Sequence, residues 1–371
     1  MAVYAGEQLL PFTKSHGRTW FDPQTGGIWF NWTCSGFTLA FTGKTLRARV
    51  MAFGDQVPGP PGVPVLTDYP CLGVAVQDGE DLSARFACGG GPQWYPLFSG
   101  EEGSHALRLV KLSENMRGKT CLLALETDGE LLAPQEADKR LSIEFVGDSI
   151  TCGYGNEAPG PEAPFQTAEE NGWMTYGALA ARELEAEFSM VSVSGIAAAR
   201  AKHPFLPSPQ MESPQMEEVY PFTDRYGYER LELEPLPWDF AAHPKDLVVI
   251  NLGTNDVNPI RFAKDTAAAD QEEAWFVERY RAFVEKVRRL NGPDTAILCV
   301  LGPMDYYLYD KIQQTVAAYQ KDTGDQRVFC LKLIGINLME EGFGSAAHPS
   351  LKTHIRMGRE LAKRICQLGL A

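Results

Sequence analysis

From residue 141 onward the chain alternates apolar runs of five to seven residues with longer amphipathic stretches, and this pattern constrains the fold most. Runs of that length suit buried strands and are too short for buried helices. Strands that alternate with helices indicate a parallel sheet, because parallel neighbours need a long crossover connection. We therefore predict an α/β domain with a five-stranded parallel sheet. The strands are expected at 141–147, 188–193, 246–252, 295–301 and 327–333.

Helices are expected between these strands and after the last one, at 171–186, 272–290, 309–320 and 350–369. In the last helix, Ser350 is placed to cap the N-terminus. Its buried stripe is predicted to contain Leu351, Ile355, Leu361 and Ile365. Residues 200–240 form a long irregular excursion whose many aromatic residues argue against disorder.

The first part of the chain has a different pattern, with short β-rich runs broken by Gly and Pro and no helical period. This pattern is typical of a β-sandwich. A length of 371 residues also favours two domains. We predict a β-sandwich domain at 1–138 and an α/β domain at 139–371.

Composition excludes several classes of partner. A net charge of −14 argues against nucleic acid and anionic membranes, because neither polyanion is attracted to an acidic protein. No basic segment followed by an apolar one opens the chain, and no run of 18 apolar residues occurs in it. We therefore expect a cytoplasmic protein that acts on neutral substrates.

The eight cysteines are scattered, with no CxxC pair, and several lie in strand-like runs. This pattern indicates reduced core thiols rather than disulfides or a zinc site. The sequence shows no ligand spacing for a metal and no lysine-containing phosphate loop, so we expect neither a metal nor an organic cofactor.

Four chemically useful residues follow the predicted strands. Ser149 comes after the first strand, Gly195 after the second, Asn255 after the third and His348 after the fifth. In an open parallel sheet, ligands bind beyond the carboxyl ends of the strands, so these residues should meet at one edge.

Such a set suits acyl transfer. A serine is a poor nucleophile until a base such as His348 takes its proton. The backbone N–H groups of Ser149 and Gly195 and the side-chain amide of Asn255 could then stabilise the oxyanion. Asp148 and Asp256 neighbour these residues and are expected to bond backbone amides and hold their turns.

The motifs GDSIT, SGIAAAR, NLGTND and HPS, in this order, resemble the four blocks of the SGNH (GDSL-type) hydrolases over residues 139–371. The chain also has a β-rich first part and, farther on, the motifs TYGALAAREL, MEEVYPFTD and WDF. With these features it most resembles carbohydrate esterase family two. That resemblance implies that the β-sandwich at 1–138 is jelly-roll-like and that residues 139–371 form a flavodoxin-like α/β/α SGNH domain. It further implies removal of acetyl groups from hemicellulose sugars. It also implies that Ser149 is the nucleophile, His348 the general base, and Ser149, Gly195 and Asn255 the oxyanion donors.

One departure from the family pattern concerns the acid of the triad. Members with a full triad carry an aspartate two or three residues before the histidine, where this chain has Ser345 and Ala346. Either a backbone carbonyl orients His348 in a Ser–His dyad, which we favour, or Glu340 or Glu341 supplies the acid.

Aromatic side chains are candidates for stacking on sugar rings. The candidates are Trp238, Tyr220, Tyr154 and Trp94. His354 lies six residues after His348 and is assigned a structural or solvent-facing position.

The substrate that the resemblance to carbohydrate esterase family two implies is an acetylated xylo- or manno-oligosaccharide. One alternative keeps the chemistry and changes the acyl group, as in a short-chain acyl esterase, a thioesterase or a lysophospholipase. A second alternative is a sugar-binding protein that has lost turnover together with the aspartate.

Overall fold

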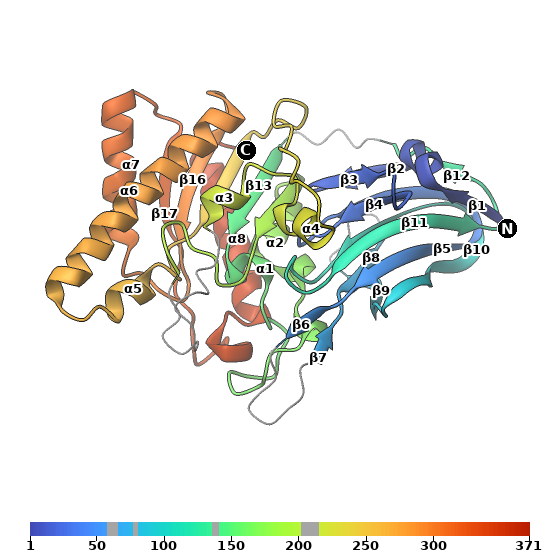
Figure 1. Ribbon diagram of the computed structural model, residues 1–371, viewed down its shortest axis with the longest axis horizontal. Coiled ribbons are helices and arrows are strands. Elements are labelled where there is room, and N and C mark those ends of the chain that lie inside the picture. The colour runs from blue at the N-terminus through green and yellow to red at the C-terminus, as the bar shows by residue number, and fades with distance from the viewer. Residues whose placement is uncertain (58–65, 77–80, 136–140, 202–214) are drawn as a thin grey trace. The chain divides into compact units, whose positions relative to one another are not determined.

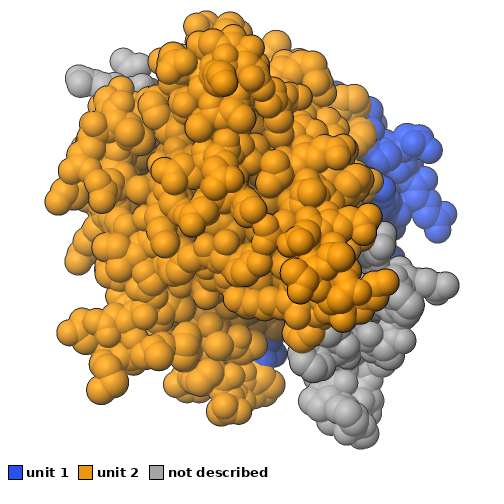
Figure 2. All heavy atoms as spheres, turned by 90° about the vertical axis from the view of Figure 1, so that its left-hand side faces the viewer, with its two compact units in different colours: residues 1–138, 165–174, 223–236 blue, residues 139–164, 175–222, 237–371 orange. Residues whose placement is uncertain are grey.

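The computed structural model describes residues 1–57, 66–76, 81–135, 141–201 and 215–371. It divides into two compact units, coloured separately in Figure 2. Unit 1 contains residues 1–138, 165–174 and 223–236, and unit 2 contains the remainder. The sequence analysis had placed 165–174 and 223–236 in the second domain, but both segments pack with unit 1. Residues 202–214 of the predicted excursion lie outside the described part of the chain.

Unit 2 is built on a five-stranded parallel sheet (Figure 1). Its strands are β13 (Ser142–Gly147), β14 (Glu187–Ser192), β15 (Leu247–Asn251), β16 (Ala296–Leu301) and β17 (Val328–Lys332). Their order in the sheet is β14-β13-β15-β16-β17, and all four pairings are parallel. This is the flavodoxin-like order, in which the first strand lies between the second and third. The predicted fold class is confirmed, and each strand lies within one residue of its predicted bounds.

Helices flank this sheet in packed groups: α2 lies against α8, and α6 contacts both α5 and α7 (Figure 1). The helices of unit 2 are α1 (Ser149–Cys152), α2 (Tyr176–Glu183), α3 (Met216–Val219), α5 (Val257–Arg261), α6 (Thr266–Asn291), α7 (Tyr309–Thr323) and α8 (Leu351–Gln367). The predicted helix at 171–186 begins only at Tyr176, because the Thr175 side chain caps it by accepting from the Ala178 amide.

The terminal helix α8 has the predicted cap, since the Ser350 side chain accepts from the Thr353 amide. Its predicted stripe is only partly right. Leu361 and Ile365 are buried, but Leu351 and Ile355 are half-buried. The buried face instead runs through His354 and Met357, which lie three or four residues apart along the same side as Leu361.

Unit 1 contains a ten-stranded sheet in which every pairing is antiparallel. Its strands are β1 (Ala2–Ala5), β2 (Thr13–His16), β3 (Thr19–Asp22), β4 (Gly27–Phe30), β5 (Gly36–Phe53), β8 (Cys71–Ala75), β9 (Leu82–Ala87), β10 (Gly91–Lys111), β11 (Lys119–Thr127) and β12 (Leu131–Leu132). A short pair, β6 (Asp55–Val57) and β7 (Leu66–Asp68), lies apart from it, and α4 (Arg225–Arg230) completes the unit with short 3₁₀ turns.

The long strand β5 shows how one sheet surrounds one core. Alternate side chains face the core at Phe37, Leu39 and Phe41, and again from Leu46 to Ala52. The pattern changes from odd to even positions around Gly43, whose φ is +116° and which lies where the pairing with β10 shifts register. The irregularity keeps the apolar face of a curled sheet directed inward. The β-rich first domain is confirmed, and its jelly-roll-like connectivity stays a prediction.

Asp224 holds the segment 223–236 in unit 1. Its carboxylate accepts from the side-chain amides of Asn31 (2.6 Å) and Asn115 (2.9 Å), and both amides are buried. The Trp32 indole N–H donates to the Thr223 carbonyl at 2.8 Å. The segment 223–236 is therefore held within unit 1 by buried hydrogen bonds.

All eight cysteines are free. Six are buried, as expected for core thiols, whereas Cys330 is half-buried and Cys366 is exposed. Among the described residues, no helix is both long and apolar enough to cross a bilayer, and no group of three His, Cys, Asp or Glu side chains could hold a metal ion.

We predict that Asp224→Ala lowers the free energy of unfolding by about 3 kcal/mol, because it leaves two buried amides without an acceptor. The matched control is Glu229→Ala, which removes an exposed pair with Arg225 and should cost about 0.5 kcal/mol or less. Urea denaturation of both variants measures the difference. Equal losses in the two would contradict this role for Asp224.

Candidate active site

Ser149 stands at the turn from β13 into α1. It is the first residue of α1, and Asp148 caps the helix by accepting from the Ile150 amide at 3.0 Å. The turn requires Gly147, because a Cβ there would lie 2.0 Å from the Thr151 hydroxyl oxygen. The first amides of a helix have no intrahelical acceptor, so the Ser149 N–H is placed to serve a ligand.

His348 contacts Ser149, although the two residues are 199 positions apart in the chain. Its Nε2 lies 2.9 Å from the Ser149 Oγ, and its Nδ1 lies 3.1 Å from the Ser345 carbonyl oxygen. A carbonyl can only accept, so Nδ1 carries the proton and Nε2 is left to accept from the serine hydroxyl. The Tyr154 ring lies against the imidazole, with centroids 4.5 Å apart.

The segment that presents the Ser345 carbonyl has an unusual backbone. Ala346 and Ala347 both have left-handed conformations, with φ of 49° and 60°. Each costs an L-residue about 1 kcal/mol or more, so surrounding contacts must compensate. The Ser345 amide donates to the Gly155 carbonyl at 3.0 Å, and the Ala346 amide donates to the Pro161 carbonyl at 3.1 Å.

Gly155, the last residue of the stretch CGYG at 152–155, lies close to the histidine loop. A Cβ at this position would lie 2.4 Å from the Ser345 Cβ. The Ser345 hydroxyl also donates to the Ala163 carbonyl at 2.8 Å. The loop after α1 and the histidine loop therefore pack too closely for a larger residue at 155.

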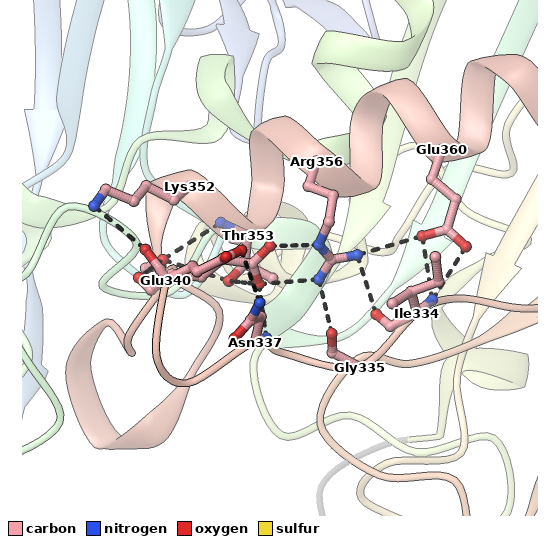
Figure 3. Close-up of polar contacts among 10 residues, drawn as sticks. Ile334, Gly335, Asn337, Glu340, Lys352, Thr353, Arg356 and Glu360 are labelled. Carbon is pink, nitrogen blue, oxygen red and sulfur yellow. Dashed lines mark hydrogen bonds and ion pairs between the residues drawn. The ribbon is translucent and has the colours of Figure 1, made fainter.

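In the described part of the chain, neither Glu340 nor Glu341 forms a hydrogen bond with His348. Each carboxylate has other partners. Arg356 on α8 binds both carboxylate oxygens of Glu341, and the Thr353 hydroxyl donates to it at 3.1 Å (Figure 3). Burial raises the pKa of Glu341, but the bonds from Arg356 and from the Asn337 amide outweigh it and lower the pKa below its usual range. Glu340 is exposed and accepts from the Asn337 side chain at 2.8 Å.

Asn255 and Gly195 lie at the same sheet edge. The Asn255 side-chain nitrogen donates to the Ile196 carbonyl at 2.9 Å and to Asp148 at 3.3 Å. These bonds join the loops after β13, β14 and β15 and fix the rotamer of the amide. Gly195 has a φ of +80°, a conformation that favours glycine. The structure thus brings the four predicted residues to one edge, with Ser149 and His348 in direct contact.

Comparison with known proteins agrees with this geometry. Residues 145–349 match the model of the GDSL-like Lipase/Acylhydrolase family. The chain belongs to that family.

Within it, similarity extends over nearly the whole chain to family two carbohydrate esterases. The solved structure of one such esterase from Clostridium thermocellum, in complex with cellohexaose, is 30% identical with a TM-score of 0.79 and covers 97% of this chain and 100% of that one. The cellulase/esterase CelE of Acetivibrio thermocellus is 34% identical over 78% of this chain. An acetylxylan esterase / glucomannan deacetylase of Cellvibrio japonicus is 28% identical over 55% of it. The chain spans about a third of the length of CelE and about half that of the Cellvibrio protein.

Two buried carboxylates organise the site of this family member. Asp256 accepts from the backbone amides of Ala198 (3.1 Å), Ala199 (2.7 Å) and Arg200 (3.2 Å), so it holds the loop that begins at Gly195. Both aspartates bond backbone amides, as expected, although those bound by Asp256 belong to the neighbouring loop rather than to its own turn. Burial raises the pKa of Asp148 to about 7 and that of Asp256 to about 6.

The predicted stacking residues differ in their exposure. Tyr220 is wholly buried, its hydroxyl accepts from Asn291 at 2.9 Å and its ring packs against Phe283, so it offers no face to a sugar. That prediction is wrong, because tertiary packing covers the ring. Trp238 is half-buried and stacks on His243 with centroids 4.3 Å apart. Tyr154 is half-buried beside His348.

His354 has a structural position and does not face solvent. It is 1% exposed, and its Nδ1 accepts from the Tyr176 amide at 3.1 Å. Burial lowers its pKa to about 3. It therefore stays neutral and joins α8 to α2.

We predict that the buried Asp148 makes stability fall as pH rises from 4 to 7. Its folded pKa of about 7 lies above the unfolded value, so in this window the folded state binds more protons and loses stability with pH, by up to about 1.4 kcal/mol per pH unit. In Asp148→Asn this dependence should become shallower when urea unfolding is followed between pH 4 and 8. The control is Asp239→Asn, at an exposed position in the same unit. Identical slopes in wild type and Asp148→Asn would contradict the prediction.

Proposed function

We propose that this protein is a serine esterase that removes O-acetyl groups from carbohydrates through a Ser149–His348 dyad. One observation carries the proposal: the Ser149 hydroxyl lies 2.9 Å from Nε2 of an imidazole whose other nitrogen bonds the Ser345 carbonyl. The nucleophile, its base and the group that orients the base are thus linked by two successive hydrogen bonds.

In the first half-reaction, the Ser149 Oγ attacks the acetyl carbonyl carbon while His348 Nε2 takes the hydroxyl proton. The carbonyl oxygen becomes an oxyanion. The Ser149 and Gly195 amides supply two hydrogen-bond donors, and Asn255 supplies the third when it exchanges its 3.3 Å bond to Asp148 for one to the oxyanion. When the tetrahedral intermediate collapses, the C–O bond to the sugar breaks and His348 returns its proton to the departing sugar oxygen.

In the second half-reaction, water attacks the acetyl group on Ser149 and gives its proton to His348. Acetate leaves, and the proton passes back to the serine oxygen. The Ser345 carbonyl keeps the ring and its tautomer in place throughout. A neutral carbonyl stabilises the imidazolium less than a carboxylate would, but it performs the same orienting task.

The family relatives support an acetylated glycan as substrate. The Cellvibrio relative is named acetylxylan esterase / glucomannan deacetylase, and the Clostridium structure holds cellohexaose. We therefore propose acetylated xylo- or manno-oligosaccharides. The net charge of −14 agrees with neutral chains rather than anionic ones.

The second candidate, sugar binding without turnover, is favoured by the cellohexaose bound to a relative and by the missing aspartate. It predicts oligosaccharide binding with equal affinity in wild type and Ser149→Ala, and no acetate release from either. The hydrogen bond between Ser149 and His348 favours catalysis, because binding alone does not need it.

We predict that wild type releases acetate from acetylated xylan and glucomannan oligosaccharides and that Ser149→Ala releases none above background. Asn255→Ala should lower kcat by about 100- to 1000-fold, because one oxyanion donor is lost. Acetate release resolved by acetyl position measures both effects, with circular dichroism as the folding control. Near wild-type release by Ser149→Ala would overturn the assignment of the nucleophile.

We predict that Glu340→Gln and Glu341→Gln each retain kcat within about threefold, because the Ser345 carbonyl orients His348. Glu341→Gln should lower stability slightly through its weakened pair with Arg356, so activity is compared at a temperature where both variants are folded. His348→Ala is the reference for a lost base. A thousandfold loss in either glutamate variant would overturn the dyad and assign the acid.

A further inference from the structure

A pocket of about 520 Å³ opens on unit 2, and the residues that line it differ from those assigned to acyl transfer. It is lined by Arg200, Gln271, Glu272, Ala274, Trp275 and Glu278. Five of these lie on α6, where 271, 274, 275 and 278 share one helical face. The volume is in the range of small-molecule sites.

Arg200 enters this pocket from a fixed backbone. Its amide donates to the buried Asp256 at 3.2 Å, and its guanidinium pairs with Glu272 at 3.1 Å. The same guanidinium lies 5.7 Å from the centre of the Trp275 ring. Arg279, held by an ion pair with Glu217, lies at an equal distance from that ring. These contacts hold the side chains that form the wall between Arg200 and Trp275.

The pocket lies at the same sheet edge as the candidate active site. Asp256, which binds the Arg200 amide, is the residue after Asn255, and consecutive Cα atoms are about 3.8 Å apart. The helix α6 begins the crossover from the carboxyl end of β15, so its first turns lie at that edge. A chain-like substrate held at Ser149 could extend toward this pocket.

We propose that this pocket is a subsite for a further sugar unit of the glycan whose acetyl group is removed at Ser149. The inference rests on the proposed function and deepens it. Guanidinium donors, carboxylate and amide acceptors and aromatic surface together match the hydroxyls and C–H faces of a pyranose.

The charges of the lining also select among glycans. Among the described lining residues, two carboxylates, Glu272 and Glu278, stand against the guanidinium of Arg200, and the nearby Arg279 is paired with Glu217. This balance disfavours a uronic acid, whose carboxylate would be repelled, and leaves neutral sugars as the preferred class.

The test compares a long substrate with one too small to reach the pocket. Trp275→Ala and Arg200→Ala are assayed with acetylated xylo-oligosaccharides and with 4-nitrophenyl acetate. We expect KM for the long substrate to rise about fivefold or more, because contacts to charged and aromatic groups are lost, while the kinetics with nitrophenyl acetate stay unchanged. The matched control is Arg281→Ala, on the same helix but paired with Glu285 and Asp322.

Unchanged KM for the oligosaccharides in both variants would overturn the subsite, and so would equal losses with the long and the small substrate. If Trp275→Ala does not fold, Gln271→Ala, at an exposed position, takes its place. If the wild type hydrolyses neither substrate, the proposed function fails separately. The subsite is then judged by calorimetry with neutral xylo-oligosaccharides, where weaker binding by the variants supports it and equal binding overturns it.

Discussion

The hydrogen bond between His348 Nδ1 and the Ser345 carbonyl is the contact on which the rest of the candidate site depends. It sets the tautomer and the direction of the imidazole, and so decides whether Nε2 faces the Ser149 hydroxyl. Hydrolases with a full triad use a carboxylate for this task. Here the acceptor is a backbone carbonyl. The conformation of the loop must therefore orient His348, a task that a carboxylate side chain performs in those hydrolases.

Two sets of contacts hold that loop. Near Ser345, two left-handed alanines turn the chain, and bonds to Gly155 and Pro161 compensate for their strain. Farther back, Arg356 binds Glu341 and the carbonyls of Ile334 and Gly335, so the loop is fixed to α8 before it reaches His348 (Figure 3). The glutamate that sequence proximity offered as a catalytic acid therefore has a scaffolding role in this structure.

The sequence predicted those parts of the molecule that depend on local pattern. Buried parallel strands are continuous apolar runs, so their bounds and the residues that follow them, Ser149 and Asn255, could be read directly. The role of the Ser345 carbonyl could not be predicted in this way. Every residue has a backbone carbonyl, and only the fold determines where that carbonyl points. Likewise, the burial of Tyr220 and the bond from Asn115 to Asp224 join positions far apart in the chain, which leave no local signal.

The position of the acidic groups completes the physical picture. The site has buried carboxylates, but they bond Asn255 and the loop after Gly195, which carry the proposed oxyanion donors, rather than the histidine. There they accept from amides that water cannot reach, and in this way Asp148 and Asp256 join three strand-end loops. The cost is that two like charges are buried near the place where an oxyanion would form. Their raised pKa values limit this cost, because a carboxyl group that holds its proton near neutral pH for part of the time repels an oxyanion less.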